Sequence, residues 1–175
     1  MLVLAAYDEK GNYSDITSRV DSDGNIQWGE FQKSAKVIAA FGGLTKQKVK
    51  RSAPGGEGLV IDYFSNNSIV NYMEGFERAF KLSGIEKGGI RSFYNDSYEV
   101  YGANWTVDFL TEFKKRRGYE LLPYINFLAD TSEAEIRPRV VADYCETVSD
   151  LLYERFTTNW VNKSHEMGMQ TRNQA

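Results

Sequence analysis

Cysteine and histidine are almost absent from this sequence of 175 residues, which contains one of each, Cys145 and His165. A single cysteine excludes an internal disulfide framework, and we expect Cys145 to be a buried, unreactive thiol within a helical pattern. A single histidine argues against a histidine-rich zinc site and disfavours a Ser-His-Asp triad.

A strong excess of charge of either sign is also missing. The 21 basic and 24 acidic residues are interspersed and give a net charge of -3. This balance offers no electrostatic basis for binding nucleic acid or an anionic membrane, so we expect neither partner. No segment has the apolar length of a membrane span, and no signal peptide is visible at Met1.

Aromatic residues are abundant, with 11 Tyr, 10 Phe and 3 Trp making up 14% of the chain. Such a content suits a carbohydrate cleft, but it equally suits an aromatic-rich core. Hydrophobic residues make up 42%, which is enough for a substantial core in one domain or in a piece of a larger one.

The first fifty residues indicate a β-rich segment. Short apolar runs at 2–7, 13–20, 26–28 and 37–41 are separated by the turn sequences DEKGN and DSDGN. The spacing of Asp21, Asp23 and Asn25 invites a calcium-loop interpretation. However, the twelfth position of such a loop needs Glu and here is Gln32, so we predict a hairpin turn.

The remaining chain alternates between strand and helix patterns. After the junction APGGEG, we predict a strand at 59–63, a helix from the cap Ser65 to Leu82, and a strand at 90–94. A helix capped by Thr106 and ended by Gly118 follows, then a short helix at 123–128. A long helix from 132 or 133 should end at Gly168 before a last strand at 169–174. Strand, helix and strand in succession predict a parallel α/β unit.

The most informative stretch is GGIRSFYNDSYEVYGANW, residues 88–105. A strand ends there in a polar loop that carries Asp96 and Glu99. Its aromatic neighbours are Tyr94, Tyr98, Tyr101 and Trp105. Loops at the carboxyl ends of parallel strands commonly hold active sites, and carboxylates with aromatic rings suit a sugar. The alternative is a strand end with solvated turn acids.

Four long motifs resemble those of glycoside hydrolase family 106: APGGEGLVIDYFS, IRSFYNDSYEVYGANWT, EFKKRRGYEL and HEMGMQTRNQA. Members of this family are α-L-rhamnosidases of pectin and other rhamnose-containing polysaccharides. The resemblance implies that residues 51–175 are a central part of a (β/α)8 catalytic domain, preceded by a β-rich insertion at 1–50. The expected fold class is therefore α/β, a partial barrel built from parallel βαβ units.

The resemblance also implies an inverting hydrolysis, in which Glu99 is the candidate general acid. Other residues that match the family motifs are candidates for binding the sugar: Asp62, Asn95, Asp96, Tyr98, Trp105, Arg172 and Gln174. The metal ligands stay unknown, although the family is described as calcium-dependent. The catalytic base is expected beyond Ala175, so the chain alone would be weakly active or inactive.

The same resemblance implies a rhamnose-containing oligosaccharide or polysaccharide as partner and a periplasmic or secreted parent protein. Incomplete barrel edges would favour self-association. The competing interpretation is a sugar-binding module or inactive fragment without hydrolysis. A further alternative is an α/β domain of another carbohydrate-active family, which fold analogy alone does not exclude.

Overall fold

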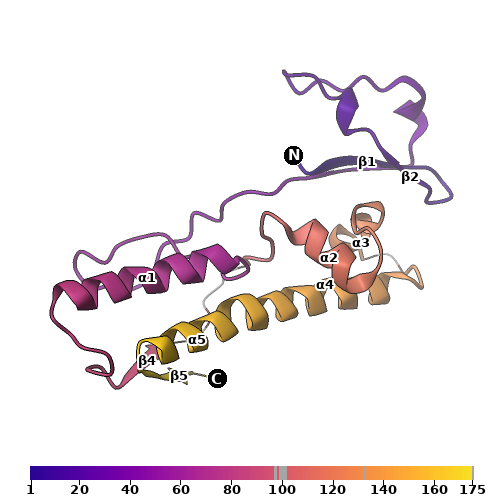
Figure 1. The fold of residues 1–175 in the computed structure, drawn as a ribbon. Helices are drawn as coiled ribbons and strands as arrows, with labels where there is room; N and C mark the ends of the chain where they lie inside the picture. The colour runs from indigo at the N-terminus through magenta and orange to yellow at the C-terminus, as the bar shows by residue number, and fades with distance from the viewer. Residues whose placement is uncertain (97, 99–101, 132, 175) are drawn as a thin grey trace. The chain divides into compact units, whose positions relative to one another are not determined.

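A computed structural model describes residues 1–96, 98, 102–131 and 133–174. The chain divides into two compact units (Figure 1). The first combines residues 1–44 with 108–147, and the second combines residues 45–107 with 148–175. The predicted boundary near residue 50, between an insertion and a catalytic domain, stays a prediction.

A three-stranded antiparallel sheet opens the first unit. Strands β1 (Val3–Tyr7), β2 (Tyr13–Asp15) and β3 (Lys36–Ala40) pair in the order β2-β1-β3. All five residues of β1 are buried, because β1 is the central strand. Leu4 and Ala6 pack with Ile16, and the side chains of Ile26, Trp28 and Phe31 complete this cluster. The sheet confirms the predicted β-rich start of the chain.

Two turns of this unit share one hydrogen-bonding pattern. The Oδ1 atom of Asp21 accepts the backbone N–H groups of Asp23 and Asn25, at 2.9 and 2.8 Å. Asp8 does the same in DEKGN, accepting from Lys10 and Asn12. Asx turns of this kind satisfy the backbone locally, which confirms the hairpin prediction. Residues 26–28 are not a strand, contrary to prediction, since only the bridge between Val20 and Ile26 forms.

The first unit also contains α2 (Phe109–Arg117), a 3-10 turn (Leu122–Tyr124), α3 (Asn126–Ala129) and α4 (Arg137–Leu151) as far as Thr147. Two further 3-10 turns, Thr17–Arg19 and Gly29–Lys33, lie within its β-rich part. The α2 side chains Phe109 and Phe113 are fully buried. Gly118 ends α2 with φ +81°, as predicted.

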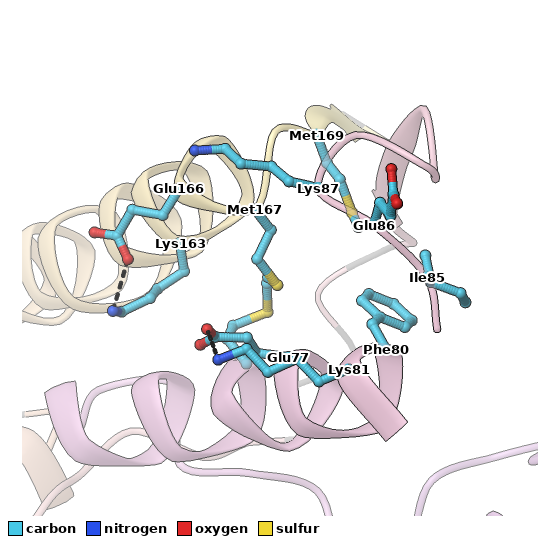
Figure 2. A pocket seen from close by; sticks show the side chains of 11 residues that line it. Glu77, Phe80, Lys81, Ile85, Glu86, Lys87, Lys163, Glu166, Met167 and Met169 are labelled. Carbon is cyan, nitrogen blue, oxygen red and sulfur yellow. Dashed lines mark hydrogen bonds and ion pairs between the residues drawn. The ribbon is translucent and has the colours of Figure 1, made fainter. Parts of the chain in front are cut away.

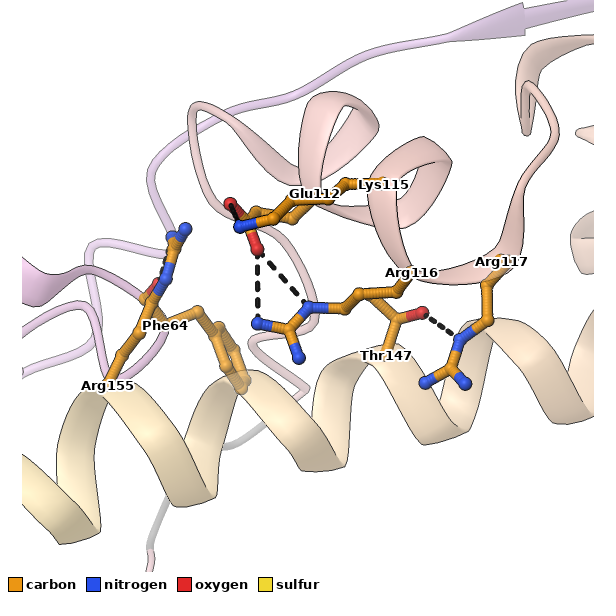
Figure 3. Close-up of polar contacts among 7 residues, drawn as sticks. All are labelled: Phe64, Glu112, Lys115, Arg116, Arg117, Thr147 and Arg155. Atoms are coloured by element: carbon orange, nitrogen blue, oxygen red, sulfur yellow. Dashed lines mark hydrogen bonds and ion pairs between the residues drawn. The ribbon is translucent and has the colours of Figure 1, made fainter.

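Two expectations for this part of the chain are wrong. Asp108, not Thr106, occupies the N-cap position of α2. Cys145 is exposed on α4 rather than buried, because the inward positions of that helix are taken by residues such as Val140. Two arginines at the end of α2 have different partners: Arg116 pairs with Glu112 within the helix, and Arg117 donates to the Thr147 hydroxyl of α4 at 3.0 Å (Figure 3).

The second unit pairs two parallel strands with helices. Helix α1 (Asn66–Leu82) precedes β4 (Ser92–Asn95), and α5 (Asn159–Glu166) precedes β5 (Gln170–Asn173). A π-helical segment, Leu152–Thr158, joins α4 to α5. The apolar core of the unit is Ile69, Met73, Phe156 and Trp160. The predicted long helix therefore forms, although it begins at Arg137 rather than at 132 or 133.

The predicted strand at 59–63 does not form. Leu59 makes one antiparallel bridge to Lys48 and is 59% exposed. A strand needs a neighbour to satisfy its backbone groups, and the described residues supply only that bridge. The chain instead turns at Asp62, whose backbone carbonyl accepts the N–H of Ser65 at 3.3 Å. The fold is mixed α/β, as predicted, while the partial (β/α)8 barrel stays a prediction.

Within the described part of the chain, the helices are too short or too polar to cross a membrane.

Candidate functional site

The carboxyl ends of β4 and β5 bring two asparagines together. The strands are parallel with Asn95 opposite Asn173, and the Nδ2 of Asn95 donates to the Oδ1 of Asn173 at 2.7 Å. The backbone N–H of Gln174 donates to the Asn95 carbonyl at 3.1 Å. Parallel strands end at the same edge of a sheet, and such edges are where α/β proteins place ligands.

Tyr98 extends this polar group. Its hydroxyl oxygen lies 3.0 Å from the Oγ1 of Thr157, and either oxygen can donate. The Nδ2 of Asn173 donates to the same hydroxyl at the longer distance of 3.5 Å. The Tyr98 ring packs edge-on against Tyr63 and Phe156, with centroids 6.2 and 5.5 Å apart. Tyr98 is therefore held at both its ring and its hydroxyl.

Thr157 belongs to the π-helical segment. A π-helix has i→i+5 hydrogen bonds and is frequent at functional sites. Within it, the hydroxyl of Thr158 donates to the carbonyl of Tyr153, five residues earlier, at 3.0 Å. Arg155 of the same segment is buried and donates from Nη1 to the carbonyl of Phe64 at 2.9 Å (Figure 3). The segment is thereby fixed to the chain that leads into α1.

Asp62 has two described hydrogen bonds, one to each carboxylate oxygen. Its Oδ1 accepts the backbone N–H of Phe64 at 2.9 Å, and its Oδ2 accepts the hydroxyl of buried Thr106 at 2.7 Å. The contact with Thr106 ties the chain before α1 to the chain before α2. Both contacts orient the Asp62 carboxylate, and Asp62 as a sugar ligand stays a prediction.

A cavity of about 710 Å³ lies beside the strand ends. Asn95 and Asp96 contribute to its wall, together with Lys50 and Arg51. The remaining wall is largely aromatic and includes Tyr63, Tyr72, Phe76, Phe93, Tyr94, Phe156 and Trp160. Cavities of a few hundred Å³ with apolar walls and a few polar groups are typical of small-molecule sites. Aromatic faces and amide groups are suited to the apolar and hydroxyl-bearing faces of a sugar.

A smaller cavity of about 250 Å³ lies between α1, α5 and the chain that leads into β4 (Figure 2). Ion pairs flank it: Glu77 with Lys81 at 3.0 Å, and Lys163 with Glu166 at 2.8 Å. The hydrogen bond from Lys81 lowers the pKa of Glu77. Met169 lines this cavity and precedes β5, so the cavity belongs to the amino end of that strand. The polar group described above lies at the other end.

The predicted site residues divide into three groups. Asn95, Asp96 and Tyr98 lie at or beside the strand ends. Trp105 is half-buried, while Arg172 and Gln174 are exposed on and after β5. Glu99, the candidate acid, and Tyr101 lie outside the described residues. The roles of Asp62, Asn95, Asp96, Tyr98, Trp105, Arg172 and Gln174 as sugar ligands, and of Glu99 as acid, stay predictions.

Two residues of the polar group were not predicted, Asn173 and Thr157. Strand alternation does not indicate Asn173, since it places the predicted ligands Arg172 and Gln174 on one face of the strand and Asn173 on the other. Nothing local marks Thr157, which contacts Tyr98 across 59 residues of sequence.

The metal ligands that the family resemblance implies are not identified among the described residues. The described residues contain no group of three or more His, Cys, Asp or Glu side chains that could hold an ion. The expectation of calcium rests on the family resemblance and is untested.

The fold is mixed α/β, and a polar group and a cavity lie at the carboxyl ends of its two parallel strands. Comparison with known proteins then identifies the chain as a member of the alpha-L-rhamnosidase family, whose model matches residues 6–175. The resemblance predicted from the four sequence motifs is thus confirmed.

Two relatives support this membership. A rhamnosidase structure from Novosphingobium sp. PP1Y superposes with a TM-score of 0.72 at 25% identity, covering 99% of this chain. A protein of Formosa agariphila named "Putative beta-glucuronidase" is 30% identical over 166 residues, 92% of this chain. The chain spans only 17% and 14% of the lengths of these two proteins.

Proposed function

We propose that a polypeptide containing this chain hydrolyses α-L-rhamnosidic bonds in a rhamnose-containing oligosaccharide or polysaccharide. The observation that carries the proposal is the family match over nearly the whole chain. The polar ends of β4 and β5 lie beside an aromatic cavity and support the proposal, because they offer a place for a sugar. Glycosidases need two carboxyl groups that flank the scissile bond, and this chain contributes Glu99 as the proposed general acid.

The proposed reaction inverts the anomeric carbon. Glu99 protonates the glycosidic oxygen while a second carboxylate removes a proton from water on the opposite face of the sugar. The two carboxyl groups of an inverting pair are about 6.5–9.5 Å apart, which leaves room for the water. We propose that the second carboxylate lies outside residues 1–175, so that this chain alone hydrolyses weakly or not at all.

The sugar would lie in the larger cavity. Asn95 and Asp96 line it and would hydrogen-bond sugar hydroxyls. Further proposed contacts come from Tyr98, Trp105, Arg172 and Gln174. Asp62 is also a proposed ligand, since each of its oxygens accepts one described hydrogen bond and can accept another.

The test is release of rhamnose from a natural, unactivated α-L-rhamnoside, by this chain and by a longer polypeptide that contains it. We expect activity in the longer polypeptide and a loss of about 10²–10⁴-fold in kcat for Glu99→Gln, the usual contribution of a general acid. Glu135→Gln is the matched control, since the Glu135 side chain is 95% exposed. Full activity of Glu99→Gln would refute the assignment of the acid.

Three subsidiary proposals each have a test of their own. Chelation followed by added Ca²⁺ should remove and restore activity if calcium is required. Sedimentation of this chain alone should reveal self-association if β4 and β5 expose pairing edges. Recovery from the periplasm or medium of the source cells would support the proposed location.

A second candidate function is hydrolysis of a glycoside of an acidic sugar. Two observations favour it: the name of the Formosa relative, and the position of Lys50 and Arg51 at the cavity. Guanidinium groups bind carboxylates in bidentate geometry, whereas rhamnose has no carboxylate. Parallel assays with a β-D-glucuronide and an α-L-rhamnoside decide between the two. Binding of either sugar without hydrolysis, in the longer polypeptide, would instead indicate a non-catalytic module.

A further inference from the structure

Asn173 lies directly opposite Asn95, on the parallel strand beside it. The Nδ2 of Asn95 donates to the Oδ1 of Asn173 at 2.7 Å, which is short for an N–H···O hydrogen bond. The backbone also joins the two strand ends, since the N–H of Gln174 donates to the Asn95 carbonyl at 3.1 Å. The Asn95 amide is therefore held by a residue that lies 78 positions later in the sequence.

This hydrogen bond decides which atoms of Asn95 remain available to a ligand. A side-chain amide has two N–H groups and one oxygen with two lone pairs. The Nδ2 of Asn95 is directed at Asn173, and the residues that the structure describes supply no partner for its Oδ1. Asn95 lines the larger cavity, whereas Asn173 is not among the described residues of its wall. Asn95 thus offers the cavity a hydrogen-bond acceptor, which suits a sugar hydroxyl that donates.

Asn173 has a second partner that orients its own amide. The Nδ2 of Asn173 donates to the hydroxyl oxygen of Tyr98 at the longer distance of 3.5 Å. With its nitrogen directed at Tyr98, Asn173 presents its oxygen to Asn95. The terminal torsion of an asparagine is broad and roughly two-fold. Without Asn173, the Asn95 amide could therefore present either its oxygen or its nitrogen to the cavity.

We propose that Asn173 is a positioning residue, which fixes the Asn95 amide so that its Oδ1 accepts a hydrogen bond from a hydroxyl of the bound sugar. The inference rests on the proposed function, in which Asn95 is a sugar ligand. Asn173 acts through Asn95 and does not itself contact the sugar. Loss of the Asn173 amide should therefore weaken substrate binding and leave the chemical step nearly unchanged.

The chain offers a matched set of variants, all made in the longer polypeptide. Asn173→Leu removes both polar atoms and nearly keeps the size of the side chain. Asn173→Asp keeps an oxygen that accepts from Asn95. Gln170→Leu is the control, because Gln170 is an exposed polar residue at the other end of the same strand, opposite Ser92.

The first measurement is steady-state kinetics on a natural α-L-rhamnoside. We expect Asn173→Leu to raise KM about fivefold and to change kcat less than about twofold, as for the loss of one hydrogen bond between neutral groups. Asn173→Asp and Gln170→Leu should stay within about twofold of the wild type in both constants. A folding defect would instead lower kcat at constant KM, because fewer molecules would be active and those would bind normally.

A double-mutant cycle tests whether Asn173 acts through Asn95. In the Asn95→Leu background, Asn173→Leu should change kcat/KM less than about 1.5-fold, because the side chain that it positions is already absent. An equal loss from Asn173→Leu in both backgrounds would overturn the proposal. A loss in Asn173→Asp as large as the loss in Asn173→Leu would overturn it too.

The outcomes also separate this proposal from the proposed function. If the wild-type polypeptide binds the rhamnoside but releases no rhamnose, hydrolysis fails as the function. The same cycle is then measured with dissociation constants from calorimetry, and the same coupling between Asn95 and Asn173 is expected. If the wild type neither binds nor hydrolyses the rhamnoside, both proposals fail.

Discussion

The hydrogen bond between Asp62 and Thr106 gives the sharpest test of the structure. Asp62 accepts from the Thr106 hydroxyl at 2.7 Å and from the Phe64 N–H at 2.9 Å. Thr106 is only 4% exposed. Hydrogen bonds to charged groups contribute about 1.5–3 kcal/mol to stability. We expect Thr106→Val to lower the free energy of unfolding by about 1.5 kcal/mol, and Asp62→Ala by about 2–3 kcal/mol because it removes two bonds.

A double-mutant cycle isolates the pair. The double variant should lose about 1 kcal/mol less than the sum of the single losses, since the shared bond can be removed only once. Urea denaturation measures these free energies. An unchanged slope of the unfolding free energy against urea concentration would show that the variants expose the same amount of surface on unfolding. Asp62→Ala combined with Thr111→Val, on the exposed face of α2, is the additive control.

Additivity of Asp62→Ala and Thr106→Val within about 0.3 kcal/mol would refute the bond as a source of stability. The proposed role of Asp62 as a sugar ligand makes a separate prediction, that Asp62→Ala raises KM for the rhamnoside in the longer polypeptide.

Three further predictions concern backbone strain and pH. Gly168→Ala should be more destabilising than Gly84→Ala by about 1–3 kcal/mol in urea denaturation. Both residues have positive φ, but of the two only Gly168 has a close neighbour, since an added Cβ would lie 3.0 Å from the backbone nitrogen of Gly88. Equal losses of unfolding free energy in the two variants would contradict this prediction. Burial raises the pKa of Tyr144 to about 12 from 10.0. The stability that neutral Tyr144 contributes is present in full below pH 10 and is lost as the pH rises toward 12. The urea midpoint of Tyr144→Phe should therefore fall less than that of the wild type over this pH range. Hydrogen bonds from Asn25 lower the pKa of Asp21 below 3.8, so its stabilising effect is present above that pH and lost as pH falls through the folded pKa. Asn25→Ala should raise this pKa in an NMR titration of the carboxyl carbon, and an unchanged pKa would count against the turn.

The sequence was most informative where local signals agree with one another. Helix α1 spans Asn66–Leu82 after Ser65, almost as predicted, since its apolar residues recur with helical spacing. The turns at DEKGN and DSDGN follow from Asp side chains that bond their own backbone. The last strand was also predicted, within a residue at each end.

The failures involve partners that lie far away in sequence. The apolar run at 59–63 has strand composition, but whether it forms a strand depends on a neighbour that its own residues do not specify. Thr106 looked like a helix cap, yet its hydroxyl bonds Asp62, 44 residues earlier. The contact between Asn95 and Asn173 spans 78 residues. Periodicity and turn chemistry contain no information about such pairs.

The contrast between local signals and partners distant in sequence also bears on where a sugar would bind. Asp62 and Asp96 are both candidates for binding sugar hydroxyls, because each lies at or just past the end of a predicted strand. Their surroundings differ, since Asp62 accepts hydrogen bonds from Phe64 and from the distant Thr106, whereas Asp96 lines a cavity together with Asn95. Each Asp62 oxygen accepts one described hydrogen bond and retains a second lone pair, so these bonds orient the carboxylate and leave it able to accept a sugar hydroxyl. We propose the carboxyl ends of β4 and β5 as the place where the substrate is held, because they border the cavity.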